Sequence, residues 1–87
     1  MSKRLGSGLF ATHVRTTSKA NEEILPTGHL FYRLEFVPLT NCTVVLNDDT
    51  TVEVVGRVGI SIDEVDMRVV SLKVKESGTK YIVAGKY

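Results

Sequence analysis

Hydrophobic and polar residues alternate over much of this chain, a pattern with period two that is typical of half-buried β-strands. The clearest case is the segment 28–37, in which every second residue is apolar: Leu30, Tyr32, Leu34 and Phe36. Phe31 and Arg33 would then share the opposite face of the same strand. Pro38 follows, and we expect it to end the strand because proline has no N–H to donate to a neighbouring strand.

Six further segments carry the same signal: 9–16, 42–46, 50–55, 57–62, 69–75 and 80–84. The alternation is less regular in the first of them. Asn47, Asp48 and Asp49 predict a tight hairpin turn between two of them, because Asn and Asp tolerate positive φ angles. The alternation places Val58 and Val70 on buried faces. The result is six or seven short strands at spacings of about 8–12 residues, which predicts an all-β fold, either a small antiparallel sandwich or a barrel.

Helical signals are weak. The only candidate is the segment 17–25, in which Ser18 could cap the first turn and Glu22 and Glu23 follow early. Pro26 would limit such a helix to about two turns, which are marginally stable on their own. We therefore predict one β domain over residues 28–87, preceded by an N-terminal arm or extension over residues 1–27.

Length and composition narrow the class of protein. A chain of 87 residues with 43% hydrophobic and 24% charged residues is typical of one small globular domain. No apolar run approaches the roughly 20 residues needed to span a bilayer. Gly6, Ser7 and Gly8 interrupt the first apolar patch, so we expect no signal peptide. The single cysteine, Cys42, cannot form an internal disulfide, which fits synthesis in the cytoplasm.

The net charge of +1 conceals three blocks of alternating sign. Residues 1–20 carry four basic residues and no acid, residues 21–66 carry nine acids against two arginines, and residues 67–87 carry five basic residues against one acid. Such blocks favour self-association or binding to a charged partner. The alternative is that both signs mix on the surface once the chain folds.

Candidates for catalysis and metal binding are few. Cys42 with His29 is one conceivable nucleophile and base, but a lone cysteine beside a β-branched run is usually a small core residue. His13 and His29 do not have the spacing of metal ligands. The acidic clusters at 48–49 and 63–66 match no calcium loop and suit turns equally well. We therefore expect no catalytic residues, no cofactor, no metal site and no enzymatic activity.

Nucleic-acid binding is an alternative, because small β-barrels stack bases on exposed aromatic residues beside basic ones. Phe31 and Arg33 share a predicted face, and Lys73, Lys75 and Lys80 could flank them. The acidic middle of the chain and the total of only six aromatic residues argue against this function. A small binding module directed at a host protein is a further alternative.

Protein–protein contact accounts best for the apolar residues that the predicted core leaves over, since exposed apolar patches commonly mark interfaces. The candidate interface residues are Leu5, Leu9, Phe10, Val14, Phe31, Arg33, Lys73, Lys75 and Tyr87. Edge strands of a small sheet could serve the same purpose. The arm at 1–27 would either add a strand to its own domain or reach a neighbouring subunit.

The segment 71–78, SLKVKESG, followed by Tyr81 and by Gly85, Lys86 and Tyr87, resembles the close of small virion proteins of tailed bacteriophages and prophages. In that family a polar hairpin rich in Asn and Thr precedes a strand of the type S-[IL]-K-[IV]-K-E-x-G, and a short aromatic strand ends in Gly-x-Tyr. The hairpin between Asn41 and Val54 is similar. The resemblance covers roughly residues 40–87.

The resemblance implies a structural role in a virion, as a capsid-associated, decoration or head–tail accessory protein made in the bacterial cytoplasm. The partners would be copies of the chain itself, a major capsid protein or another virion protein. It brings no catalytic residues. On this hypothesis we expect the arm to contact a neighbouring subunit and the charge blocks to set the register.

Overall fold

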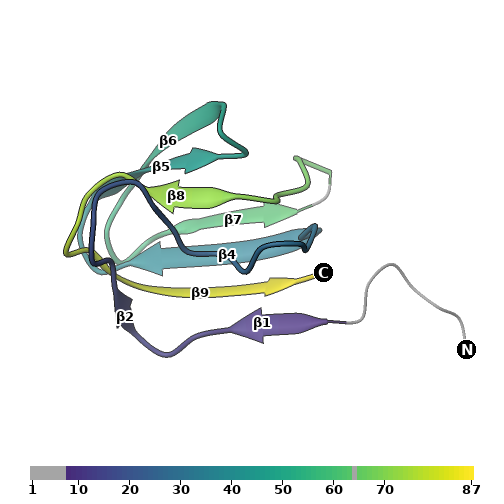
Figure 1. Ribbon diagram of the computed structural model, residues 1–87, viewed down its shortest axis with the longest axis horizontal. Helices are drawn as coiled ribbons and strands as arrows, with labels where there is room; N and C mark the ends of the chain where they lie inside the picture. The colour runs from purple at the N-terminus through teal and green to yellow at the C-terminus, as the bar shows by residue number, and fades with distance from the viewer. Residues whose placement is uncertain (1–7, 64) are drawn as a thin grey trace, which may run out of the picture.

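A computed structural model of the chain describes residues 8–63 and 65–87, and these residues form an all-β structure. The strands belong to two antiparallel sheets (Figure 1). The prediction of an all-β fold is confirmed. Among the described residues, no helix is long and apolar enough to cross a membrane.

The five-stranded sheet has β9 at its centre (Figure 1). Its main order is β1 (Leu9–Ala11), β9 (Lys80–Lys86), β4 (Arg33–Pro38) and β7 (Ile60–Asp63). The short β2 (Arg15–Thr16) also pairs with β9, beside Lys80 and Tyr81. The segment predicted as one strand over 9–16 is therefore divided in two by a bend.

The four-stranded sheet has the order β3 (Glu22–Glu23), β8 (Leu72–Val74), β5 (Cys42–Leu46) and β6 (Thr50–Val54). Its β5–β6 hairpin has the predicted turn, in which Asn47 and Asp48 have φ angles of 54° and 60°. The described strands leave edges at β1 and β7 in one sheet and at β3 and β6 in the other, so they form no closed barrel.

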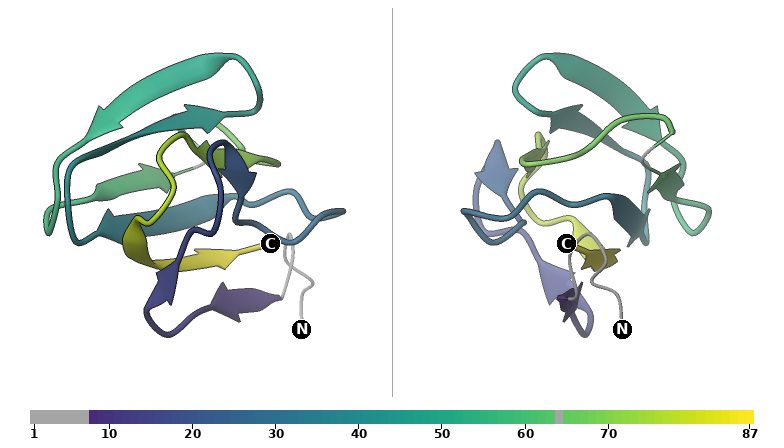
Figure 2. Two further views of the ribbon diagram at one scale, coloured as in Figure 1. Left: turned by 60° about the vertical axis from the view of Figure 1, so that its left-hand side comes forward. Right: turned by 90° about the vertical axis from the view of Figure 1, so that its right-hand side faces the viewer.

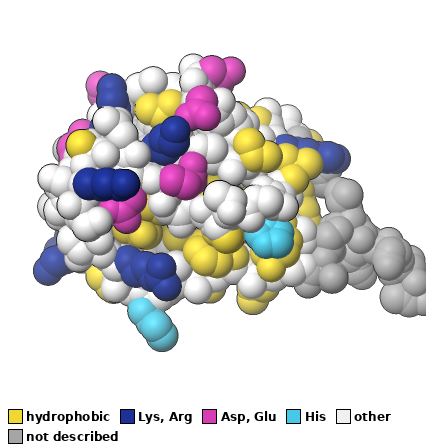
Figure 3. Space-filling model, viewed as in Figure 1, with side chains coloured by type: hydrophobic (Ala, Val, Ile, Leu, Met, Phe, Trp, Pro, Cys, Tyr) yellow, Lys and Arg dark blue, Asp and Glu magenta, His cyan; other side chains and the backbone are white. Residues whose placement is uncertain are grey.

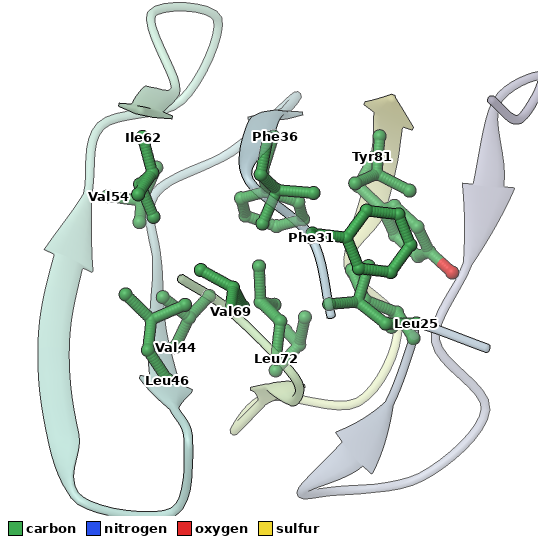
Figure 4. Close-up of a cluster of buried hydrophobic side chains, with 14 of the residues drawn as sticks. Leu25, Phe31, Phe36, Val44, Leu46, Val54, Ile62, Val69, Leu72 and Tyr81 are labelled. Atoms are coloured by element: carbon green, nitrogen blue, oxygen red, sulfur yellow. The ribbon is translucent and has the colours of Figure 1, made fainter. Parts of the chain in front are cut away.

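Both sheets contribute side chains to a single hydrophobic core (Figure 4). Phe36 and Val83 come from the five-stranded sheet, and Val44, Leu72 and Val74 come from the four-stranded one; all five are fully buried. Figure 2 shows the two sheets from two further directions. Burial of these apolar side chains is the main term that holds the sheets together.

The strand predicted over 28–37 is shorter than expected, and this moves Phe31 to the other face. The chain bends at Tyr32, and β4 begins only at Arg33. Phe31 exchanges two backbone hydrogen bonds with Val69, of 2.8 and 2.9 Å, as an isolated bridge. Because the bend shifts the alternation by one residue, Phe31 is fully buried and Leu30 is 45% exposed.

The predictions for Val58 and Val70 are wrong for a related reason. Val58 is 71% exposed because it lies in a turn before β7, next to Gly59 with its φ angle of +75°. Val70 is 50% exposed, whereas its neighbour Val69 is fully buried opposite Phe31. In both places a turn or an isolated bridge interrupts the strand, so alternation counted along the sequence loses its phase.

Residues 8–27, within the range predicted as an arm, supply β1 and β2 to the five-stranded sheet and β3 to the four-stranded one. No helix forms at 17–25. The Glu22 carboxylate does accept bonds from the Ser18 N–H and hydroxyl, at 2.7 and 2.8 Å, as a helix cap would. Asn21 then adopts a φ angle of 57°, and the chain continues as β3. The domain boundary at residue 28 stays a prediction.

Candidate interaction surface

The predicted interface residues near the N-terminus lie at the β1 edge of the five-stranded sheet. Leu9 is 68% exposed and Val14 is 54% exposed, so both can contact a partner. Phe10 is half-buried and packs against the core, with its ring edge-on to that of Phe31. Leu5 lies outside the described residues.

The expected outward position of Phe31 is wrong, because its side chain is fully enclosed in the core. Its ring lies edge-on to the Tyr87 ring, with centroids 5.3 Å apart. Tyr87 is half-buried and stacks on His29 at 3.8 Å, and its backbone forms two hydrogen bonds with Gly8. This cluster of aromatic rings is therefore mainly a structural contact, with Tyr87 only partly accessible.

The basic candidates Arg33, Lys73 and Lys75 do not gather around an aromatic platform. Arg33 lies on the outer face of its sheet, 3.7 Å from the Asp63 carboxylate. Lys73 donates a 2.8 Å hydrogen bond to Asp48, and this contact raises the pKa of the ammonium group. Lys75 is exposed. Since Phe31 is buried, the pairing of Phe31 with Arg33 that favoured nucleic-acid binding is wrong.

The outer face of the five-stranded sheet combines small apolar and charged side chains. The strand register places Leu9, Lys86 and Arg33 in one row across β1, β9 and β4. A shallow hollow of about 170 Å³ lies over this part of the sheet, lined by Leu9, Arg33, Glu35, Ala84, Gly85 and Lys86. On the side of the molecule that Figure 1 shows, apolar side chains are likewise exposed among mixed acidic and basic ones (Figure 3).

A second hollow, of about 230 Å³, lies where β5 and β6 meet the turn that follows β8, and is lined by Asn41, Cys42, Thr43, Glu53, Val54, Val55 and Glu76. The Glu76 carboxylate accepts a 2.9 Å hydrogen bond from the Thr43 N–H. Burial, with a smaller effect from the Glu76 charge, raises the pKa of the Cys42 thiol to about 11. The thiol is therefore protonated near neutral pH and is a poor nucleophile.

We expect the free energy of unfolding to fall as the pH rises from 9 toward about 11. The pKa of Cys42 is higher in the folded chain than its usual value of 9.0, and burial also raises the pKa of Tyr81. Both groups favour folding while protonated, so their contribution is complete below pH 9 and is lost as the thiol and phenol ionise. Denaturant unfolding across this range measures the slope, and Cys42→Ala should reduce it. A slope unchanged by that substitution would contradict the effect assigned to the thiol.

The free edge of β6 is a feature that sequence reasoning did not single out. Thr43 uses both of its backbone groups on the β8 side: its carbonyl accepts from the Lys75 N–H, and its N–H donates to Glu76. Neighbouring residues of an antiparallel strand point their backbone groups in opposite directions, so Cys42, Val44 and Leu46 face β6. Their β6 partners are Val54, Val52 and Thr50.

Thr51 and Glu53 consequently direct their N–H and C=O groups away from β5. No described strand lies on that side of β6 (Figures 1 and 2). The edge runs over Thr50–Val54, TTVEV, without a proline, a glycine or a lysine to discourage pairing. The signal in the sequence was this run of β-forming residues, but its place at an edge follows only from the strand order.

Among the described residues, no three His, Cys, Asp or Glu side chains are arranged to hold a metal ion. No family model, curated protein or solved structure matches the chain.

Proposed function

We propose that the chain is a non-enzymatic structural protein of a tailed-phage virion, made in the bacterial cytoplasm and incorporated into the particle. It would act as a capsid-associated, decoration or head–tail accessory protein by binding copies of itself, a major capsid protein or another virion protein. The observation that carries the proposal is the set of exposed apolar residues along the β1–β9 side of the five-stranded sheet: Leu9 at 68%, Val14 at 54% and Ile82 at 41%.

Exposed apolar side chains support a binding role because water contact with them is unfavourable and a partner surface would remove it. Leu9 lies over the hollow of about 170 Å³, where the short side chain of Ala84 leaves space for a partner side chain. Arg33, Glu35 and Lys86 border the same hollow and would select a partner of complementary charge.

The surroundings of the two candidate catalytic residues, Cys42 and His29, support the non-enzymatic part of the proposal. Cys42 is 5% exposed and its raised pKa keeps the thiol protonated. His29 stacks on Tyr87 and lies edge-on to Phe31, so its ring serves a packing contact. In this proposal both residues maintain the fold, and recognition is left to surface side chains and strand edges.

The finer architecture that we propose is an open sandwich of the two sheets, with the segment 1–27 acting as the extension through which the domain contacts a neighbour. Residues 8–27 would contact the neighbour while they remain part of the two sheets, in which β1 and β2 pair with β9 and β3 pairs with β8. Leu9, in β1, and Val14, in the bend before β2, would then be presented at the edge of the sheet.

Particles that lack this chain test the proposal. Purified chain added to particles from a strain in which its gene is deleted should co-sediment with them and saturate at a fixed ratio to the capsid protein. The variant Leu9→Asp should bind less, because it places a charge on the exposed apolar surface. Ser77→Asp, which adds the same charge in an exposed turn before β9, is the matched control. Failure of the wild-type chain to co-sediment at any concentration would refute the proposal.

A further inference from the structure

We propose that a second copy of this chain pairs with β6 edge to edge. The two β6 strands would run antiparallel about a two-fold axis at Val52 and join two four-stranded sheets into one of eight. This inference rests on the assembly role proposed above and deepens it, because it names the partner as another copy and the surface as the β6 edge.

Hydrogen bonding favours this register. Thr51 and Glu53 each direct an N–H and a C=O to the open side of β6, as the pairing of β5 with β8 requires. With the axis at Val52, Thr51 lies opposite the partner's Glu53, and Glu53 lies opposite the partner's Thr51. All four backbone groups of each edge then form inter-chain hydrogen bonds, and none is left unpaired.

Repulsion between like charges disfavours the two symmetric registers next to the one with its axis at Val52. An axis at Thr51 would place Glu53 directly opposite the partner's Asp49, and an axis at Glu53 would place two glutamates opposite each other. Like charges at directly opposite positions destabilise a strand pair. The axis at Val52 instead sets Glu53 against the partner's Thr51 and Asp49 against the partner's Val55.

The axis also brings the two Val52 side chains together. Val52 is half-buried and packs against the core from the last strand of the sheet. At a non-hydrogen-bonded antiparallel pair the two Cα atoms lie about 4.5 Å apart, so Val52 would contact the partner's Val52. The pairing therefore covers an apolar side chain that the single chain leaves half-exposed.

The ends of β6 carry complementary charges. The turn before it contains Asp48 and Asp49, and Arg57 follows shortly after its last residue. Arg57 is exposed and forms an ion pair with no other described residue. Antiparallel pairing crosses the ends, so each Arg57 approaches the partner's Asp49, which favours a second copy as the occupant.

The β3 edge has only two residues, and the β7 and β1 edges are less suited to pairing than β6. On β7, the Asp66 carboxylate accepts a 3.1 Å hydrogen bond from the Asp63 N–H, and the Asp63 carbonyl accepts from the N–H groups of Asp66 and Met67. On the β1 side, a bend at His13 and Val14 interrupts the edge after three residues. Both features are common protections against edge-to-edge association, and β6 has neither.

Sedimentation velocity of the full chain tests the dimer. The wild type should show a reversible monomer–dimer equilibrium. Thr51→Pro removes an N–H that faces away from β5, so it should weaken the dimer at least tenfold while the fold is kept. Thr51→Ser retains that N–H and should dimerise like the wild type. A wild type that remains monomeric at every concentration, or that grows beyond a dimer, would overturn the proposal.

Oxidative cross-linking tests the register and does not depend on whether the proline variant folds. Val52→Cys should form an inter-chain disulfide readily, because two Cα atoms about 4.5 Å apart lie within the range that a disulfide spans. Ser77→Cys, in the exposed turn before β9, is the matched control and should remain uncrosslinked. Equal cross-linking of the two variants would overturn the proposed register.

These results are separable from the proposed function. A monomeric chain that still co-sediments with particles would refute the β6 dimer and leave the virion role intact. A dimer that meets both tests but does not bind particles would support the pairing and refute the virion role.

Discussion

Replacing Phe31 with alanine is expected to lower the free energy of unfolding by about 3–5 kcal/mol. The Phe31 ring is fully buried and contacts the rings of Phe10, His29 and Tyr87. Removing it creates a cavity at one end of the core, where Gly85 packs against the ring. Denaturant unfolding followed by far-UV circular dichroism measures the loss.

The control for this prediction is Leu9→Ala, at a side chain that is 68% exposed. It should change the free energy of unfolding by no more than about 0.5 kcal/mol, because little apolar surface is buried there. An effect of Phe31→Ala as small as that of Leu9→Ala would mean that Phe31 is exposed, as alternation in the sequence predicted.

Replacing Gly59 with alanine should cost at least about 3 kcal/mol. Gly59 has a φ angle of +75°, which L-residues with a side chain rarely adopt. A Cβ atom at this position would also lie 2.3 Å from the Phe36 carbonyl oxygen and 2.8 Å from a Val37 methyl carbon. The turn would have to move away from β4, and the pairing of β7 with β4 would be disturbed.

Gly78 provides a matched control for Gly59, because it has the same φ angle of +75° but nothing within 4 Å of an added Cβ. Gly78→Ala should cost only about 1–2 kcal/mol, the penalty for the left-handed conformation itself. Denaturant unfolding of both variants isolates the steric contribution at Gly59. Equal losses at the two sites would contradict the close approach of Gly59 to β4.

Sequence alternation predicted the β5–β6 hairpin well. Asn47 and Asp48 supply the positive φ angles of the turn, and Val44, Leu46 and Val54 are buried as expected. Regular pairing over five residues on each side keeps the alternation in phase, so local sequence suffices there.

Alternation failed where long-range contacts decide the backbone path. Phe31 is buried because its backbone bonds to Val69, which lies far away in the sequence. β3 was not predicted, and it is held to β8 by the Glu23 carboxylate, which accepts hydrogen bonds from the Ser71 hydroxyl and the Leu72 N–H. Neither contact leaves a local signal, because each depends on which strands become neighbours.

The candidate interaction surface was only partly predictable, because part of it depends on which strands become neighbours. Exposure of Leu9 and Val14 agrees with the expectation that apolar residues near the N-terminus remain available for contacts. The free edge of β6 depends on the strand order, which alternation alone does not determine. The role of Leu9, Val14 and the β6 edge in an interface stays a prediction.

Quantitative mass spectrometry of gradient-purified phage particles tests most directly whether this chain is a virion component. We predict that it is present in intact particles at a constant ratio to the major capsid protein and that it remains after a salt wash. Its absence from particles, in lysates that contain the free chain, would contradict the proposed function.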